Sequence, residues 1–253
     1  GNGTTIISGD GAGSGLFEVT GQNVTIQGIQ FVDTNAKNNF TYGGSVNGVG
    51  VRFNGANGGV LKDSTFKDFN SAVQVMGTIG LTIENNKFSG GYTTLIANDP
   101  TVNVETGSKS LNIYRQSSNI TVRGNTFEGK ILDAISIAQG SGSNIVENNV
   151  FINNTYAIYF GGSSTKNTIV RNNTFKGCGE FKQDGQYWER LPVISIQKAS
   201  NDIAFENNTF EAVENSVLIA AEQGNEAHGF PSSLGNINVT GSIVKTTGLD
   251  NAS

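Results

Sequence analysis

Asparagine recurs two residues before phenylalanine at five places, and this repeat constrains the fold of the chain more than any other feature. The five copies are Asn86-Lys87-Phe88, Asn125-Thr126-Phe127, Asn149-Val150-Phe151, Asn173-Thr174-Phe175 and Asn208-Thr209-Phe210. Weaker copies place Phe31, Phe66 and Val244 in the phenylalanine slot. Repeats of this length are typical of solenoids, in which each coil of the chain contacts only its neighbours. The sequence therefore predicts about eight stacked coils.

Each repeat also carries apolar residues in alternation, which is typical of short strands with one buried face. An apolar residue lies five positions before each phenylalanine slot: Ile26, Leu61, Ile83, Val122, Val146, Val170, Phe205 and Val239. A second apolar pair follows in seven coils: Val51/Phe53, Val73/Val75, Leu95/Ala97, Ile135/Ile137, Ile158/Phe160, Ile194/Ile196 and Val217/Ile219. The 24 residues from Phe127 to Phe151 fit three short strands and three turns in each coil.

Two columns of polar residues follow from the same stacking. The repeated asparagines predict an asparagine ladder, because a buried amide on each coil can bond the amide above and the amide below. An outward column alternates in charge from coil to coil: Lys62, Glu84, Arg123, Glu147, Arg171 and Glu206. We expect these residues to form ion pairs between adjacent coils rather than a charged binding strip.

Each of the five copies has an asparagine at a turn and a phenylalanine two residues after it. In this feature the chain resembles the right-handed parallel β-helix proteins with the pectate-lyase type of repeat. The resemblance implies an all-β, single-stranded right-handed parallel β-helix solenoid of about eight coils, forming one domain over residues 1–253. Among such proteins it is most like the β-helix regions of adhesin-like surface proteins. No cap is evident at either end, so we expect a segment excised from a larger surface or secreted protein, or ends covered by partners.

Composition excludes several classes of function. A net charge of −5 and a pI near 4.9 argue against nucleic acid, which requires basic patches. No apolar run approaches the roughly 20 residues of a membrane span, so no membrane insertion is expected. The lone Cys178 has no partner for a disulfide or a metal cluster, and neither a metal nor a cofactor is predicted. Richness in Asn, Thr, Ser and Gly, together with nine Asn-x-Ser/Thr sequons, favours an extracellular or cell-surface location.

Four coils are longer than the rest, and long insertions on a regular scaffold commonly carry function. By position, segments 32–48 and 177–191 precede the second strand of their coils, whereas 98–112 and 222–235 follow it. The second-strand sheet is therefore predicted to form the floor of a cleft that, by the resemblance, holds an extended polysaccharide. Its central outward column is expected to be Arg52, Gln74, Ile96, Ser136, Tyr159, Ser195 and Leu218. The outward column before it is expected to be small, with Gly50, Ala72, Thr94, Ala134, Ala157, Val193 and Ser216.

This floor is predicted to carry no carboxylate, so no catalytic residue is assigned to it. Aromatic faces stack on sugar rings and Arg or Gln bond hydroxyls, which makes side chains on the floor and on the 177–191 wall candidates for glycan binding. The predicted ligand-binding residues are Arg52, Gln74, Tyr159, Tyr187, Trp188, Arg190 and Gln197, with Tyr42 nearby. The competing interpretation is that Trp188 merely folds its loop back onto the solenoid.

Two functions follow from these residues. The first is a non-catalytic, adhesin-like surface domain that binds a cell-surface glycan or other polysaccharide, or that extends a stalk. The second is a polysaccharide lyase or glycoside hydrolase acting through loop residues on an extended polysaccharide, of which uronate polymers are one class. Its candidate groups are Arg115, Asp184, Arg190, Lys198 and His228, and a Ca²⁺ held by Asp184, Glu189 and Glu222 would favour it. Absence of carboxylates from the floor favours the first.

Overall fold

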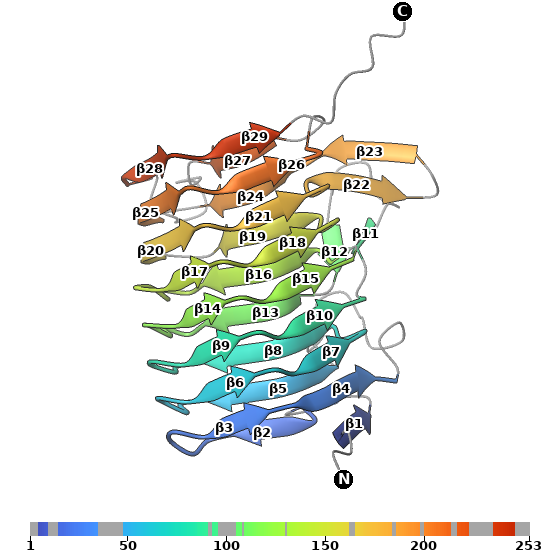
Figure 1. Cartoon of the computed structure of the whole chain (residues 1–253), viewed down its shortest axis with the longest axis vertical. Helices are drawn as coiled ribbons and strands as arrows, with labels where there is room; N and C mark the ends of the chain where they lie inside the picture. The colour runs from blue at the N-terminus through green and yellow to red at the C-terminus, as the bar shows by residue number, and fades with distance from the viewer. Residues whose placement is uncertain are drawn as a thin grey trace, which may run out of the picture.

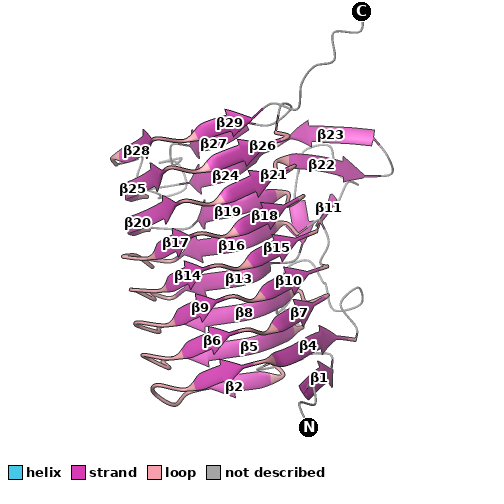
Figure 2. Ribbon diagram, viewed as in Figure 1, coloured by secondary structure: helices cyan, strands magenta, loops and turns pink. Residues whose placement is uncertain are grey.

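The computed structural model describes residues 5–9, 15–34, 48–90, 93–95, 105–107, 109–129, 131–161, 165–183, 186–197, 200–213, 217–222 and 235–245. None of these residues lies in a helix, and three long parallel sheets wind around one core (Figures 1 and 2). The prediction of an all-β, right-handed parallel β-helix is confirmed. Across the described residues, no helix has the length and hydropathy needed for a membrane crossing.

Each sheet runs the length of the solenoid. Sheet A comprises β1 (Thr5–Gly9), β4 (Ile29–Asp33), β7 (Thr65–Lys67), β10 (Lys87–Ser89), β15 (Thr126–Glu128), β18 (Val150–Ile152), β21 (Thr174–Lys176), β26 (Thr209–Glu211) and β29 (Ile243–Lys245). Sheet B comprises β2 (Phe17–Val19), β5 (Val49–Asn54), β8 (Ser71–Met76), β13 (Lys109–Tyr114), β16 (Asp133–Ala138), β19 (Tyr156–Gly161), β24 (Pro192–Gln197) and β27 (Val217–Glu222). Sheet C comprises β3 (Thr25–Gln27), β6 (Val60–Lys62), β9 (Thr82–Glu84), β14 (Thr121–Arg123), β17 (Ile145–Glu147), β20 (Lys166–Arg171), β25 (Asn201–Glu206) and β28 (Ile237–Thr240).

The chain passes from sheet B to sheet C to sheet A in every coil, and each strand pairs with its counterparts in the coils before and after it (Figure 1). Sheets B and C each hold eight strands, which gives the eight coils expected from the repeat. Two antiparallel hairpins interrupt this winding: β11 (Thr93–Leu95) with β12 (Glu105–Gly107), and β22 (Glu180–Gln183) with β23 (Gln186–Arg190). We call one level of the stack a rung.

Stacked phenylalanines and asparagines explain why the repeat folds this way. Phe31, Phe66, Phe88, Phe127, Phe151, Phe175 and Phe210 form one pile with ring centres 4.8 to 5.0 Å apart. Beside it, the Nδ2 of Asn86 donates to the Oδ1 of Asn125 at 3.1 Å, and the Nδ2 of Asn125 donates to the Oδ1 of Asn149 at 3.0 Å. The same bond continues to Asn173 and Asn208. Each donor also reaches a strand carbonyl, so the buried amides are satisfied.

A second buried polar row lies at the turn from sheet B to sheet C. It consists of Thr78, Ser117, Ser141, Thr165 and Ser200, all fully buried. The hydroxyls of Thr78, Ser117 and Ser200 donate to a carbonyl at the end of the preceding strand, as Ser117 does to Tyr114 at 2.7 Å, and that of Thr165 donates to the carbonyl of Ile137 on the adjacent rung. This row could not be predicted from the sequence, because Ser and Thr are also common in exposed turns.

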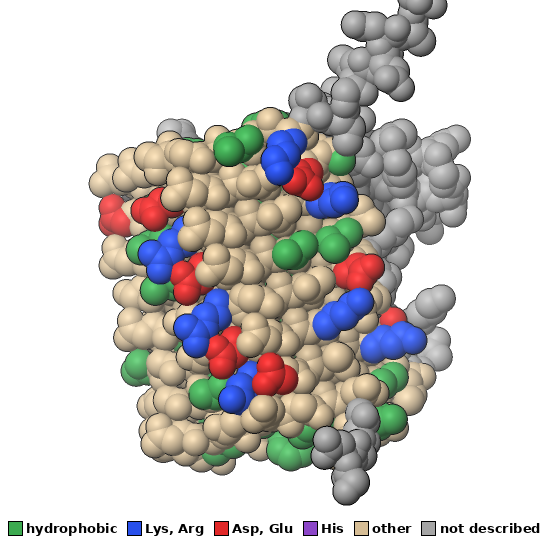
Figure 3. Space-filling model, in the orientation of Figure 1, with side chains coloured by type: hydrophobic (Ala, Val, Ile, Leu, Met, Phe, Trp, Pro, Cys, Tyr) green, Lys and Arg blue, Asp and Glu red, His purple; other side chains and the backbone are tan. Residues whose placement is uncertain are grey.

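The outward charged side chains of sheet C form ion pairs between neighbouring strands. Arg123 contacts Glu84 at 2.6 Å and Arg171 contacts Glu147 at 2.7 Å, each bridging adjacent rungs. Figure 3 shows acidic and basic side chains side by side down this face. Among the described residues, the column therefore consists of separate pairs rather than one continuous run of ion pairs.

The predicted positions were wrong in two strands of sheet B. In the fourth coil, Leu111 and Ile113 pair with Val73 and Val75, whereas Leu95 ends a strand of the β11–β12 hairpin. The apolar residues of that hairpin mimicked the alternation of a sheet strand. In the last coil, Ile219 and Ala221 pair with Ile194 and Ile196, so the inward pair lies two residues later than the predicted Val217/Ile219.

The insertions are consequently arranged differently from the prediction. The insertion of the fourth coil comes between β10 and β13, that is, before the sheet B strand. Three insertions therefore lie at the corner between sheets A and B, and one follows β27 at the corner between sheets B and C. The prediction that two insertions lie on each side of the sheet B face was therefore wrong.

Candidate functional site

The outward face of sheet B carries four of the seven predicted ligand-binding residues, three of them in its central column. Its strand pairing places Glu18, Arg52, Gln74, Asn112, Ser136, Tyr159, Ser195 and Ala220 on successive rungs. Asn112 and Ala220 take the slots that the sequence analysis gave to Ile96 and Leu218, because of the two shifts described above. The column is thus polar or small except at Tyr159, and its members Gln74, Ser136 and Ser195 are nearly fully buried.

The preceding column does not face outward as predicted. Ala72, Ala134, Ala157 and Val193 are buried in the hydrophobic core. A Cβ added at Gly50 would contact the ring of Phe66 at 3.2 Å, so this position faces the phenylalanine pile. Thr94 lies on β11 rather than in this column, which Ser110 occupies on the fourth rung, and Ser216 lies outside the described residues. Small residues are required here because the column packs against the large rings of sheet A.

Arg52, Gln74 and Tyr114 form the first polar group on this face, which we call the Arg52 cluster. The Nε of Arg52 donates to Gln74 Oε1 at 2.9 Å, and the hydroxyl of Tyr114 donates to the same oxygen at 3.2 Å. The guanidinium of Arg115 lies 5.7 Å from the centre of the Tyr114 ring. Burial raises the pKa of Tyr114, opposed by the charges of Arg115 and Arg52. The phenol therefore stays protonated at neutral pH and acts as a donor.

Tyr159 is the centre of a second group, the Tyr159 cluster. Its hydroxyl donates to Gln197 Oε1 at 2.6 Å, and its ring meets that of Tyr156 edge-on with centres 6.1 Å apart. The Nζ of Lys109 lies over the same ring, 5.6 Å from its centre. Lys109 also forms an ion pair with Asp133 at 2.5 Å. An aromatic ring, an amide and a compensated ion pair are thus gathered over four rungs.

The expectation of a floor without carboxylates was wrong. Asp133 lies on β16 with 4% of its side chain exposed, and Glu18 lies on β2. Asp133 and Lys109 were not predicted, because the wrong position of the fourth strand placed them in different columns. With Lys109 in its true register, opposite charges occupy the same position on adjacent rungs. That signal would have identified the pair.

The two clusters bring together four of the seven predicted ligand-binding residues. Arg52 contacts Gln74 and Tyr159 contacts Gln197, but the two pairs are separated along the stack. Tyr187, Trp188 and Arg190 lie on β23, at the corner between sheets A and B, where strand β22 of the same hairpin lies beside β11 of the other hairpin.

The remaining candidates of the catalytic hypothesis that the structure describes lie on different elements. Glu189 is on β23 and Glu222 ends β27, while Arg115 follows Tyr114. Tyr42, Asp184, Lys198 and His228 lie outside the described residues. In the part of the chain that the structure describes, no three His, Cys, Asp or Glu side chains gather as a metal site.

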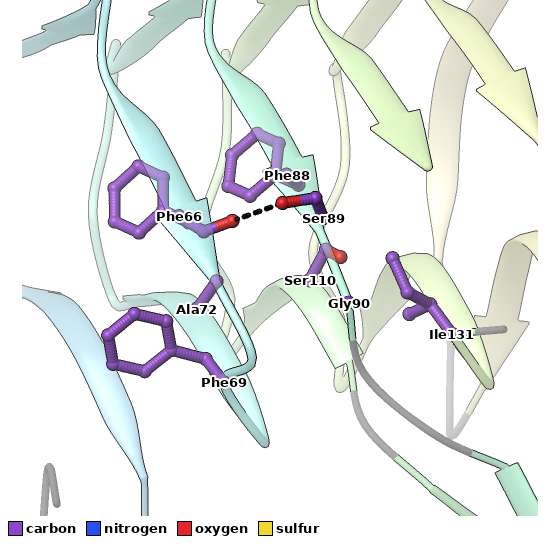
Figure 4. Close-up of a pocket in the computed structure, with 8 residues that line it drawn as sticks. All are labelled: Phe66, Phe69, Ala72, Phe88, Ser89, Gly90, Ser110 and Ile131. Carbon is purple, nitrogen blue, oxygen red and sulfur yellow. Dashed lines mark hydrogen bonds between the residues drawn. The ribbon is translucent and has the colours of Figure 1, made fainter. Parts of the chain in front are cut away.

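A small pocket opens at the corner between sheets A and B (Figure 4). It has a volume of about 10 Å³ and is lined mainly by Phe66, Phe69, Phe88 and Ile131. Ser89 donates to the carbonyl of Phe66 at its rim at 3.5 Å. A space of this size holds about one water molecule, so the pocket is a packing defect rather than a ligand site.

Solved structures share this architecture. An alginate lyase from Paenibacillus sp. str. FPU-7 is similar at a TM-score of 0.60 and 15% identity, over 98% of this chain and 80% of that one. A DFA-IIIase from Arthrobacter chlorophenolicus in complex with GF2 is similar at 0.53 and 14%, over 94% of this chain and 61% of that one. A double mutant of the tailspike protein of the E. coli bacteriophage HK620, in complex with a pentasaccharide, is similar at 0.51 and 11%, over 96% and 47%.

At such identities the likeness concerns the fold alone, and the chain spans less than two thirds of the last two proteins. No curated protein matches the chain in sequence. The family model described as "Right handed beta helix region" matches residues 5–210, which is most of the chain. The protein therefore belongs to the right-handed β-helix family.

Proposed function

We propose that this chain is a polysaccharide-binding domain whose ligand lies across the strands on the outward face of sheet B. The observation that carries the proposal is the presence of the Arg52 and Tyr159 clusters in one sheet face, with the half-buried polar Asn112 on a rung between them. Aromatic rings contact the apolar faces of sugars, and Arg, Gln and Tyr bond their hydroxyls. The resemblance to structures named for alginate cleavage and for a bound pentasaccharide supports this choice.

We further infer that the domain is non-catalytic and adhesin-like, and that it works at the cell surface or outside the cell as part of a larger protein. In the Tyr159 cluster, the carboxylate of Asp133 is engaged by Lys109 and almost fully buried. This arrangement suits a fixed binding surface better than a carboxyl that must approach a glycosidic bond. A polysaccharide partner also fits an extracellular site of action.

Affinity electrophoresis through gels cast with single polysaccharides tests the proposal. We expect retardation by at least one intact polymer, and roughly 2- to 10-fold weaker binding for Arg52→Ala and Tyr159→Ala. Arg171→Ala is the matched control, since Arg171 bonds a neighbouring rung at 2.8 Å as Arg52 does at 2.9 Å, but on sheet C. Free migration in every gel, or equal loss in the control, would contradict the proposal.

Polymer cleavage is the second candidate, and one observation favours it. The Lys109 ammonium and the Tyr159 hydroxyl are both able to exchange a proton, and both belong to the same cluster. Staining the gels for residual polymer distinguishes the candidates, because an enzyme clears its track and a binding domain leaves the polymer intact. Cleavage that survives Lys109→Met and Tyr159→Phe would remove this cluster from the chemistry.

A further inference from the structure

The environment of Tyr159 is built to hold its ring in one place. A Cβ added at Gly161 would overlap Cε1 of Tyr159 and would lie 2.9 Å from Cδ1 and 3.0 Å from Cζ. The ring edge therefore occupies the space of a side chain at position 161. Gly161 follows Tyr159 by two residues on β19, so both lie on the same outward face.

This glycine is not explained by backbone conformation. The glycines with positive φ in the described chain are needed for left-handed turns, but Gly161 is not among them. Alanine fits the backbone of β19, and the three atoms nearest to its Cβ would all belong to the Tyr159 ring. The role of Gly161 is therefore to admit the ring.

The charges around the ring identify the kind of ligand. Lys109, which lies over the ring, is already paired with the nearly buried Asp133 on the adjacent rung. The hydroxyl of Tyr159 is turned to the neutral amide of Gln197. A carboxylate placed here would meet Asp133 and would gain only a cation that is already compensated. A neutral sugar, by contrast, finds an aromatic surface with donors and acceptors around it.

We propose that Gly161 positions the Tyr159 ring as a preorganised stacking surface for an uncharged sugar ring. This inference rests on the proposed function and adds a positioning residue and a ligand class to it. Preorganisation strengthens binding because a ring already held in place loses little freedom when the ligand arrives. Gly161 is a positioning residue, since it acts through the tyrosine.

Binding of neutral and acidic polymers to Gly161→Ala tests the inference. The probes are hydroxyethyl cellulose and galactomannan as neutral polymers, and alginate and polygalacturonate as uronate polymers. We expect the wild type to bind a neutral polymer and Gly161→Ala to bind it roughly 2- to 10-fold more weakly. Gly21→Ala is the control, because its added Cβ would contact only the Val24 side chain, at 3.3 Å, in the turn after β2 and five rungs from Tyr159.

A double-mutant cycle separates positioning from a general loss of stability. Because Gly161 acts through the ring, adding Gly161→Ala to Tyr159→Ala should cause no further loss of affinity. Additive losses, or unchanged affinity in Gly161→Ala, would overturn the inference. Binding of uronate polymers alone would also overturn it while leaving the proposed function standing. If the wild type binds no polymer, the proposed function itself fails.

Discussion

One asparagine on each of five rungs joins its coil to the next through both its backbone and its side chain. The Oδ1 of Asn149, for example, accepts from both the backbone N and the Nδ2 of Asn125. Its own Nδ2 donates to Asn173 and to the carbonyl of Val122. At this scale the sequence was informative, because the amide chemistry requires a like residue above and below.

Asn149→Leu should therefore destabilise the protein well beyond the loss of one contact. The substitution leaves buried donors and acceptors without partners, at about 1 to 3 kcal/mol for each group. Thermal and denaturant unfolding measure the change. The exposed Asn54→Leu is the control and should change stability by less than about 0.5 kcal/mol. Similar losses in the two variants would contradict this account.

Cys178 provides a test of burial at a single residue. Its side chain is fully buried, and burial raises the pKa of the thiol to about 12. A thiol with a raised pKa is protonated at pH 8, whereas the nucleophile is the thiolate. Iodoacetamide should therefore label the protein at pH 8 only in the presence of denaturant. Rapid labelling of the native protein would show that the coil around Cys178 opens readily.

Strands of three residues are too short to fix their order alone, and paired charges on sheet C add specificity between rungs. Glu147 and Arg171 lie directly opposite each other on β17 and β20. Their side chains are 16% and 39% exposed, so solvent screens the attraction and the pair contributes modestly.

Arg171→Glu should destabilise the protein by roughly 0.2 to 1 kcal/mol, because it places like charges opposite each other. The added substitution Glu147→Arg restores opposite charges and should recover most of the loss. High salt should reduce the difference between the single variant and the wild type, since screening weakens exposed charges. Denaturant unfolding at two salt concentrations measures both effects, and a salt-independent loss would indicate a packing cause.

Across the whole molecule, the sequence predicted the solenoid and its eight coils but not the course of the long coils. The phenylalanine and asparagine slots repeat in identical surroundings, so their periodicity is visible without a structure. The β11–β12 hairpin interrupts that periodicity with two strands that belong to no parallel sheet. Leu95 of this hairpin was therefore wrongly predicted to be a core residue. The error then displaced Lys109 from its slot and concealed the Tyr159 cluster. Gly161 gave no signal, because its role depends on where a neighbouring ring lies.

Removing one whole coil should leave a folded protein. Deleting residues 128–151 joins Phe127 to Ile152 and places Asn125 below Asn173, so like residues still stack. We expect cooperative unfolding with lower stability and a solenoid shorter by about 4.8 Å. Circular dichroism and small-angle scattering measure both. Deleting residues 128–139 is the control, because half a coil destroys the stacking. If the half-coil deletion folds and the whole-coil deletion does not, the coil is not the structural unit of the protein.

The parallel stacking of sheet B also fixes the distances between residues on its outward face. Residues in its outward column are separated by whole numbers of strand spacings, each about 4.8 Å. Arg52 and Tyr159 are four strand pairings apart, so a ligand that contacts both must match the length of four strand spacings. Gain or loss of one coil between them would change the distance between the two contact points by one strand spacing and would leave both contact residues intact.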